Sequence, residues 1–416
     1  RCHLTHPKII FKMEFPIWIP FQSEWWTFFV ILASIPILIF ISELTFKLKV
    51  LSPESNRRLV HFFVGILITI SPFIFSEYIL PSILALIFLF VNYFAYHNEK
   101  FLGIHSQDRV TYGTIYFPLG YLAIAIGFWQ YSEFIIISLA ILAVADPIAA
   151  IIGESTSKYN KFIIWKDKKT IQGTITFYSI SFFLILLLGK LLFQFSNSYL
   201  LCFALFSAIG STISEITSSK GSDNLSIPIV SVLFMIGFVE RITPNQSDFF
   251  TILYSPFLSL ILFLALIFYI AFKLKTLSLD GFLGAFLMGA IIILVGSQYF
   301  FMLLAIFFIL SSVLSKILKR ASFYRTKGSE RDILQVYANG GIALLLSIIY
   351  FLNNDPVYIY LFASSVAAAM SDTWGTEFGK LSKHKPISIT SLKSIDHGIS
   401  GGITRVGTLG SLLGSS

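Results

Sequence analysis

Two acidic residues of this 416-residue chain lie at the ends of long apolar or small-residue stretches. Asp146 lies within FIIISLAILAVADPIAAIIGE, and Asp372 lies within SDTWGTEFGK, after a stretch rich in Ala, Ser and Val. An ionisable group inside a membrane segment is costly and is therefore functional by default. A carboxylate in such a place can hold the magnesium ion that accompanies a nucleotide. Both acids therefore predict metal and phosphate chemistry, with simple helix capping as the alternative for Asp146.

Pro147 predicts how the backbone around Asp146 is arranged. Asp at the N-cap with Pro at the first helical position is typical of a helix start, so the span is expected to break here. The new N-terminus would offer free N–H groups and a positive dipole end to a phosphate. Ser371 or Asp372 is expected to cap a second new helix in the same way.

A basic loop follows Asp146 in the segment KYNKFIIWKDKKTIQG. Cations, a hydroxyl and a glycine that lets the backbone approach closely are the groups that bind phosphate. The loop supplies all three, in Lys158, Lys168, Lys169, Thr170 and Gly173. An ordinary cytoplasmic loop explains the charge equally well, but it does not explain the clustering with Asp146.

Two further segments are expected to face the same side of the membrane. SNRRLVH places Arg57, Arg58 and His61 at the entrance of a span. A structural role is the alternative for this histidine. ISEITSSKGSDNLSIP adds Glu215, Asp223 and Asn224. Three acids from separate loops, Asp146, Glu215 and Asp223, are expected to share one or two magnesium ions.

The second half of the chain carries a comparable set of residues. RDILQVYANGG contains Asn339, and the segment from SDTWGTEFGK to KSIDHGISGG contains Asp372, Glu377, Lys383, Gly398 and Gly401. Glycines in such a loop let backbone N–H groups approach phosphate. We predict that Asp146, Lys168, Lys169, Asp372 and Glu377 are catalytic. The metal ligands are predicted to be Asp146, Glu215, Asp223 and Asp372. Nucleotide and phosphate are predicted to bind at Arg57, Arg58, His61, Lys158, Thr170, Gly173, Asn224, Asn339, Lys383, Gly398 and Gly401.

The composition indicates that these residues belong to a membrane protein. Hydrophobic residues make up 56% of the chain and charged residues only 12%, which is far from the balance of a soluble globular protein. The net charge of +8 is scattered between apolar stretches, so it argues against nucleic-acid binding. Cys2 and Cys202 support neither a disulfide framework nor a cysteine metal site.

About thirteen spans of roughly 20 mostly apolar residues are expected, which predicts an all-α, polytopic helical membrane protein. They lie near 25–44, 59–76, 78–96, 111–129, 134–152, 174–193, 199–217, 226–239, 252–272, 281–297, 299–317, 334–352 and 357–371. The stretch 401–414 is too short to cross, so further spans are expected after residue 416. Most of the 30 Lys and Arg residues fall in alternate loops, which predicts an outside N-terminus and a cytoplasmic active face, in a bacterial inner membrane.

The polar segment ERITPNQSDFF is the best candidate for a domain boundary. We expect a tail at 1–24, a first membrane domain at 25–240, a linker at 241–250 and a second membrane domain at 251–416. The spacing of Gly and Lys after the acid is similar in the two halves, which predicts two fused, related units unless the similarity is coincidental.

The segments RRLVH, ADPIAAIIGE, KDKKTIQG and SDNLSIP resemble the dolichol kinase and phytol kinase family, relatives of phosphatidate cytidylyltransferase. The resemblance covers roughly residues 50–240 and implies phosphorylation of a long-chain isoprenoid alcohol by CTP. Arg58 stands where a Lys is commoner, and Glu154 replaces the basic residue that usually follows the Gly. The second departure leaves the triphosphate contacts open.

The segments QVYANGG, SDTWGTEFG and DHGISGGIT resemble a family of integral membrane proteins that includes the plant phytyl-phosphate kinase. This resemblance covers roughly residues 255–416 and implies that a second phosphate is added to an isoprenoid monophosphate, from a donor that the sequence does not identify.

Together the two resemblances imply a membrane kinase. It would convert an isoprenoid alcohol to the monophosphate with CTP and Mg²⁺, and then convert the monophosphate to the diphosphate. Its expected partners are the alcohol, its monophosphate, a nucleoside triphosphate and membrane lipid, and not nucleic acid. Two alternatives stay open. A cytidylyltransferase would need similar machinery, and an ion-coupled transporter would also place acids and broken helices in the membrane.

Overall fold

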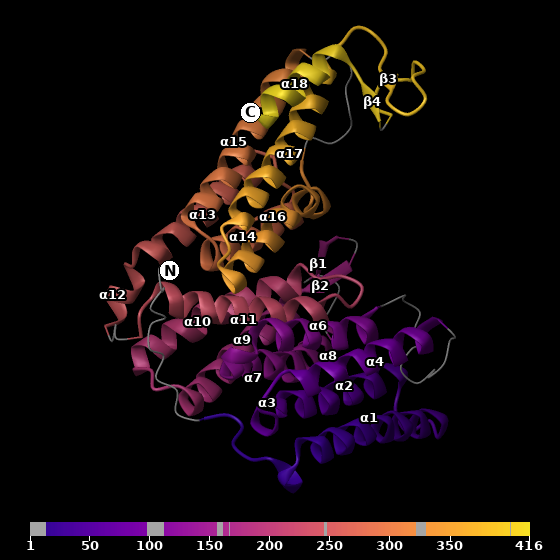
Figure 1. The fold of residues 1–416 in the computed structure, drawn as a ribbon, viewed down its shortest axis with the longest axis vertical. Coiled ribbons are helices and arrows are strands. Elements are labelled where there is room, and N and C mark those ends of the chain that lie inside the picture. The colour runs from indigo at the N-terminus through magenta and orange to yellow at the C-terminus, as the bar shows by residue number, and fades with distance from the viewer. Residues whose placement is uncertain are drawn as a thin grey trace. The chain divides into compact units, whose positions relative to one another are not determined.

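The computed structural model describes residues 14–97, 112–155, 161–165, 167–244, 248–321, 330–399 and 401–416, and Lys158 lies outside these residues. The chain divides into two compact units, Arg1–Ser259 and Leu260–Ser416. Both units are built of helices, with only short strands among the described residues (Figure 1).

The first unit holds most of the helices and a small hairpin. In chain order its elements are η1 (Pro20–Gln22), α1 (Glu24–Lys47), α2 (Pro53–Thr69), α3 (Ser71–Ile74), α4 (Ile79–His97), α6 (Gly113–Phe128), η2 (Trp129–Tyr131), α7 (Ser132–Ala140), the π-helix η3 (Ile141–Ala145), α8 (Asp146–Glu154), β1 (Lys161–Ile164), β2 (Asp167–Thr170), α9 (Ile171–Leu192), α10 (Asn197–Ile216), α11 (Asp223–Arg241) and α12 (Phe249–Leu253). The strands pair antiparallel, with Ile163 opposite Lys168.

The second unit begins within α13 (Pro256–Lys273). It continues with α14 (Leu279–Val295), α15 (Gln298–Ala321), α16 (Ile333–Asn353), α17 (Val357–Gly379), β3 (Ile387–Ser388), β4 (Gly402–Ile403) and α18 (Arg405–Ser415). The short helix α18 packs against α17 through small residues. A Cβ on Gly414 would lie 2.8 Å from the backbone carbonyl oxygen of Met370, so a larger residue there would require the two helices to shift.

Ten helical segments of the described chain are long and apolar enough to cross a membrane, which confirms the predicted class of polytopic helical membrane protein. The predicted count of thirteen is not confirmed. Gly113–Glu154 is one apolar segment of 42 residues, Leu279–Val295 is apolar but short, and α17 is not among the ten.

Several helix starts follow directly from the sequence. Ser, Thr and Asp side chains accept a backbone N–H at the starts of α1, α2, α9, α10, α12, α14, α16 and α18. Such a cap satisfies one of the N–H groups that a helix start leaves without a partner. The serines and threonines between apolar stretches therefore define where these helices begin.

The helix around Asp146 differs from the prediction. The α-helix α8 does begin at Asp146, but the preceding residues Ile141–Ala145 form a π-helix, and Ala145 keeps right-handed helical angles. The N-cap position of α8 is Ala145, which makes no side-chain cap hydrogen bond, and Asp146 is already the first residue of the helix. The prediction that the helix breaks here and offers an open helix N-terminus is therefore wrong. A π-helical turn takes the place of a break, and such turns are frequent at functional sites.

Helix α17 also runs without a break past Ser371 and Asp372. The prediction that one of these residues caps a new helix is therefore wrong. Small residues such as Ala and Ser permit a continuous helix here, because they neither crowd the backbone nor remove its hydrogen bonds.

Candidate active site

A cavity of about 830 Å³ in the first unit has a polar end and an apolar end. Its polar wall comes from α2, α8, β2 and the start of α11, with charged or amide side chains from Arg57, Arg58, His61, Asp146, Asp167, Lys168, Lys169, Lys220, Asp223 and Asn224. Its apolar wall comes from α1, α2, α4 and α6, with Ile31, Ile35, Ile39, Val64, Leu67, Ile68, Phe75, Leu84, Phe88 and Phe117. Such a cavity suits an amphiphilic ligand with one polar end.

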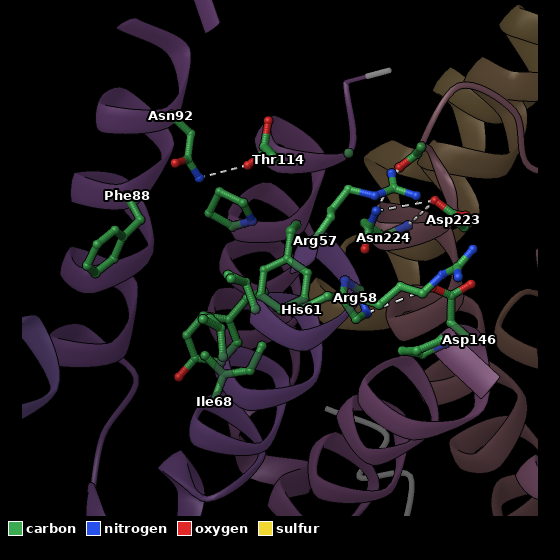
Figure 2. Close-up of a pocket in the computed structure, with 18 of the residues that line it drawn as sticks. Arg57, Arg58, His61, Ile68, Phe88, Asn92, Thr114, Asp146, Asp223 and Asn224 are labelled. Carbon is green, nitrogen blue, oxygen red and sulfur yellow. Dashed lines mark hydrogen bonds and ion pairs between the residues drawn. The ribbon is translucent and has the colours of Figure 1, made fainter. Parts of the chain in front are cut away.

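Figure 2 shows how the two ends are arranged. Arg57 and Arg58 extend from α2 toward the side where Asp146 and Asp223 lie. Ile68 lies farther along α2, and the same helix therefore lines both ends of the cavity. From Arg57 to Ile68 the helix advances roughly 16 Å at 1.5 Å per residue. The cavity thus follows a large part of a membrane-spanning helix.

His61 contacts the π-helical turn before Asp146. Its Nε2 atom lies 3.0 Å from the carbonyl oxygen of Leu142 and 3.8 Å from Asp146 Oδ2. Because a carbonyl oxygen only accepts, Nε2 must carry the proton and donate. In a π-helix the partner of Leu142 would be residue 147, and Pro147 has no N–H to give. His61 therefore satisfies a carbonyl group that the Asp-Pro sequence leaves open.

Lys169 and Glu215 form a partly buried ion pair between the hairpin and α10. Nζ lies 2.5 Å from Glu215 Oε1 and 2.8 Å from the carbonyl oxygen of Glu215. Burial alone would lower the pKa of Lys169, but the carboxylates of Glu215, Asp223 and Asp146 together raise it above its ordinary value. All three predicted acids are thus close enough to act on one ammonium group. Glu215 itself does not line the cavity.

Arg58 pairs with Glu154 across the gap between α2 and α8. The Arg58 side chain is largely buried, whereas that of Glu154 is mostly exposed. The carboxylate of Glu154 here neutralises a cavity arginine. Arg58 Nε is buried without a hydrogen-bond partner within the described chain, so this guanidinium retains an unused donor.

The start of α11 positions Asp223 and Asn224. The backbone N–H of Asn224 donates to Asp223 Oδ1 at 2.9 Å, and Asn224 Nδ2 donates to the Gly221 carbonyl at 3.2 Å. Asn224 Oδ1 is buried with no hydrogen-bond partner among the described residues. Gly221 has a φ of +86°, and a Cβ there would lie 2.5 Å from the backbone nitrogen of Gly113. This glycine lets the loop before α11 lie against the start of α6.

The oxygen groups at the polar end fit a magnesium ion in part. Asp146 and Asp223 are carboxylates, and Asn224 Oδ1 is an unused amide oxygen; these are the ligand types that Mg²⁺ prefers. In the described ranges no three His, Cys, Asp or Glu side chains gather into a ready-made metal site. Magnesium is often held by one or two carboxylates together with nucleotide phosphates, so this arrangement matches a metal that arrives with its nucleotide.

Two predicted phosphate-binding residues have a structural role at the hairpin. Thr170 caps α9 by accepting the N–H of Gly173 at 3.1 Å. A Cβ on Gly153 or Gly173 would lie within 3 Å of Thr170 Oγ1, so both glycines let α8 and α9 approach closely. Neither Thr170 nor Gly173 lines the cavity, whereas the neighbouring Lys168 and Lys169 do.

The residues predicted in the second unit are less closely gathered. Asp372 is exposed on α17, and Glu377 accepts a hydrogen bond from Lys380 at 2.9 Å. Lys383 and the two loop glycines are exposed, with Gly398 and Gly401 at positive φ. Asn339 lines a small cavity of about 50 Å³ together with Arg331. Burial lowers the pKa of the Arg331 guanidinium, and the Glu377 carboxylate opposes that shift.

The sequence interpretation missed the whole apolar end of the cavity. Leu, Ile and Phe facing a cavity look the same in a sequence as those facing lipid or core. It also missed Asp167, which lines the polar end and accepts the backbone N–H of Lys220 at 3.3 Å. Tyr121 and Ser71 form a buried hydrogen bond of 2.7 Å within the apolar wall, which a scattered Tyr and Ser could not have indicated.

The helices and this cavity define a helical integral membrane protein with a bipartite, charged and apolar site. Residues 262–416 match the family described as integral membrane protein DUF92. An uncharacterized membrane protein of Methanocaldococcus jannaschii is 35% identical over 145 residues, which are 34% of this chain and 60% of that protein. Protein PGR of Arabidopsis thaliana is 31% identical over 166 residues, 36% of this chain and 57% of that protein.

The phytol kinase of a Synechocystis species is a more distant relative, 25% identical over 194 residues, which are 46% of this chain and 82% of that protein. The chain spans about 60% of the length of the archaeal and plant relatives. No solved structure matches the chain. The predicted likeness of the second half to an integral membrane family is confirmed, as is a distant one to phytol kinase, whereas the likeness to dolichol kinase stays a prediction.

Proposed function

We propose that this protein is a membrane-embedded kinase that transfers the γ-phosphate of a nucleoside triphosphate, CTP by preference, to the hydroxyl group of an isoprenoid alcohol. The single observation that carries the proposal is the cavity with cations and acids at one end and aliphatic side chains at the other. An isoprenoid alcohol has the same polarity: one hydroxyl group on an apolar tail. The distant similarity to a phytol kinase supports the same chemistry.

In this proposal the polar end binds the phosphates. Arg57, Lys168 and Lys220 line the cavity and supply positive charge to the triphosphate. The alcohol oxygen bonds to the γ-phosphorus while the bond from that phosphorus to the bridging oxygen breaks, so that CDP leaves with the bonding electrons. The hydroxyl proton passes to a cavity carboxylate. Catalysis rests mostly on positioning and charge neutralisation, as is usual in phosphoryl transfer.

Asp146, Asp223 and the Asn224 amide oxygen would hold magnesium, which neutralises charge on the phosphates when it is bound. His61 is a positioning residue in this scheme, because its N–H fixes the Leu142 carbonyl in the turn before Asp146. Lys169 lines the same polar end of the cavity, and its ion pair with Glu215 favours the charged form of its ammonium group. The active face is proposed to be cytoplasmic, where the soluble nucleotide is available.

The decisive experiment follows the label of the nucleotide. Membranes containing the protein are incubated with farnesol, geranylgeraniol, phytol or a longer polyprenol and CTP labelled at the γ-phosphate, with ATP in parallel. Label in the lipid is the expected result. Label that appears only in pyrophosphate would mean attack on the α-phosphate and would replace the kinase with a cytidylyltransferase. Solute uptake that needs Asp146, without any lipid phosphorylation, would favour a transporter.

We also propose that the second unit phosphorylates the resulting monophosphate to the diphosphate. A partly buried arginine, Arg331, lies near the carboxylate of Glu377, and Lys380 is the ion-pair partner of that acid. These are groups of the types that phosphoryl transfer uses. The same incubation, run with an isoprenyl monophosphate and each nucleotide, tests this step separately by its diphosphate product.

A further inference from the structure

A second hollow lies beside the candidate active site and shares part of its wall. It is a groove of about 530 Å³ between α1 and α4. Only Ile39 of α1 and Phe88 of α4 line both the groove and the cavity, among the residues that define the two hollows. These two side chains therefore form the partition between the cavity and the groove.

The groove is open to the surroundings of the protein and is mostly apolar. On α1 it includes Phe40, which is 68% exposed, and Leu44, which is 45% exposed. On α4 it includes Val91, which is 40% exposed. Because α1 and α4 are both long enough to span a membrane, these exposed apolar side chains face lipid in the bilayer. The partition thus separates the cavity from lipid.

Helix α1 is built so that this wall can move. Asn56 is fully buried and ties the C-terminal part of α1 to α2, with Nδ2 donating to the Ser42 carbonyl at 2.8 Å and Oδ1 accepting from Thr45 at 2.9 Å. Nearer the start of α1, Pro36 lines the groove and has no N–H to give to the Leu32 carbonyl. At its start α1 is also held, because Glu24 Oε1 accepts the backbone N–H of Ser76 at 3.0 Å. The helix is therefore anchored at both ends and has an interrupted hydrogen-bond ladder between them, beside the partition.

Phe88 lies close to a polar residue of the cavity. It is one helical turn from Asn92, which lines the cavity and donates to the Thr114 carbonyl at 2.8 Å. Figure 2 shows Phe88 and Asn92 on the same helix, facing the cavity from the side opposite Asp146. An amphiphile that passes Phe88 would have its polar end near Asn92 and its tail still beside the groove.

We propose that the lipid substrate reaches the cavity sideways from the bilayer, through a portal between α1 and α4 whose gate is formed by Ile39 and Phe88. This inference rests on the proposed function for the identity of the lipid as an isoprenoid alcohol. A tail too long for the cavity continues through the open portal into the groove, so the site accepts alcohols of very different length.

The kinetic test narrows the portal and compares long and short tails. Phe88→Trp and Ile39→Trp fill it, while Ile37→Trp and Leu86→Trp introduce the same indole side chain on the same helices at exposed positions away from both hollows. The gate variants should lower kcat/KM for geranylgeraniol about tenfold and for a longer polyprenol further, with KM for CTP unchanged. Values for the gate variants within about twofold of those for the two controls would overturn the portal.

A second measurement does not depend on turnover. An isoprenoid alcohol with a diazirine at the end of its tail is photolysed in membranes that contain the unaltered protein, with and without excess geranylgeraniol. The expected result is competed labelling on groove residues of α1 and α4. Competed labelling confined to the deep apolar wall formed by α2 and α6 would overturn the portal even if the kinase is active. Absence of any phosphorylated alcohol, with competed groove labelling, would overturn the proposed function and leave the portal standing.

Discussion

His61 Nε2 and the carbonyl oxygen of Leu142 lie 3.0 Å apart, which joins α2 to the π-helical turn that carries Asp146 into the cavity. The contact explains why a histidine stands one turn after Arg57 on α2. It also means that the position of Asp146 depends on a residue from another helix.

Asp146→Asn should abolish phosphorylation of the alcohol, because the amide removes a negative charge that would hold magnesium and leaves the shape unchanged. The expected loss is on the order of a hundredfold or more in kcat. Phosphorylation of the monophosphate by the second unit should persist, and Asp372→Asn should show the reverse pattern. Both products are measured separately by chromatography. Loss of both activities in each variant would contradict two independent sites.

Lys168→Gln should raise KM for CTP about tenfold, because Lys168 lines the cavity and contributes positive charge to the phosphates. Lys161→Gln is the matched control, since Lys161 is an exposed cation on the paired strand and does not line the cavity. Steady-state kinetics at fixed alcohol concentration give the comparison. Equal KM values in the two variants would show that the hairpin acts only as a basic surface.

Lys169→Met should destabilise the folded protein by about 2 kcal/mol, less than for a fully buried pair, because it leaves the partly buried Glu215 carboxylate without its partner. The pKa of Lys169 is raised in the folded state, so the stabilising effect is fully present below its unfolded pKa of about 10.4 and is lost as pH rises through the folded value. The difference in Tm between the unaltered protein and this variant should stay constant from pH 7 to about 10 and shrink above that.

Thermal unfolding in detergent measures this difference across pH. The double variant Lys169→Met with Glu215→Leu is the control, because it removes both charges and leaves neither one unpaired. It should recover much of the lost Tm. A difference that grows as pH rises would contradict the sign of the shift.

Gly221→Ala should lower the Tm of the protein and displace the residues of the polar wall. Gly221 has a φ of +86°, and an added Cβ would meet the backbone of Gly113. The strain from positive φ alone is about 1–3 kcal/mol, and the contact adds to it. Gly341→Ala is the matched control, because nothing lies within 4 Å of a Cβ there and the helix interior favours Ala by about 1 kcal/mol. Opposite shifts in Tm are expected from the two substitutions.

Much of the fold and part of the site could be predicted from the sequence. Apolar stretches indicated where the helices lie, because lipid leaves few other options for the backbone. Asp146 stood out because a membrane segment rarely contains an acid without a use. Asp223 was expected beside it as one of three acids from separate loops. Their placement on one cavity wall agrees with the expected shared site, although which groups bind magnesium stays a prediction.

The rest of the site depends on contacts between distant segments. Glu215 pairs with Lys169 rather than facing the cavity, and nothing in ISEITSSK distinguishes an ion-pair acid from a metal ligand. The π-helical turn was missed because an Asp-Pro pair favours a helix start locally, while the packing around Leu142 and His61 supports a continuous helix. Apolar cavity residues such as Ile35 carry no signal of their own.

The gate formed by Ile39 and Phe88 has a consequence for how the protein works in a cell membrane. Two apolar side chains form it, so opening it exchanges one set of van der Waals contacts for another. The free energy of opening is then set by how tightly the neighbouring acyl chains are ordered. Turnover should therefore rise in thin or fluid bilayers and fall in ordered ones, which makes the lipid phase itself a regulator of the rate.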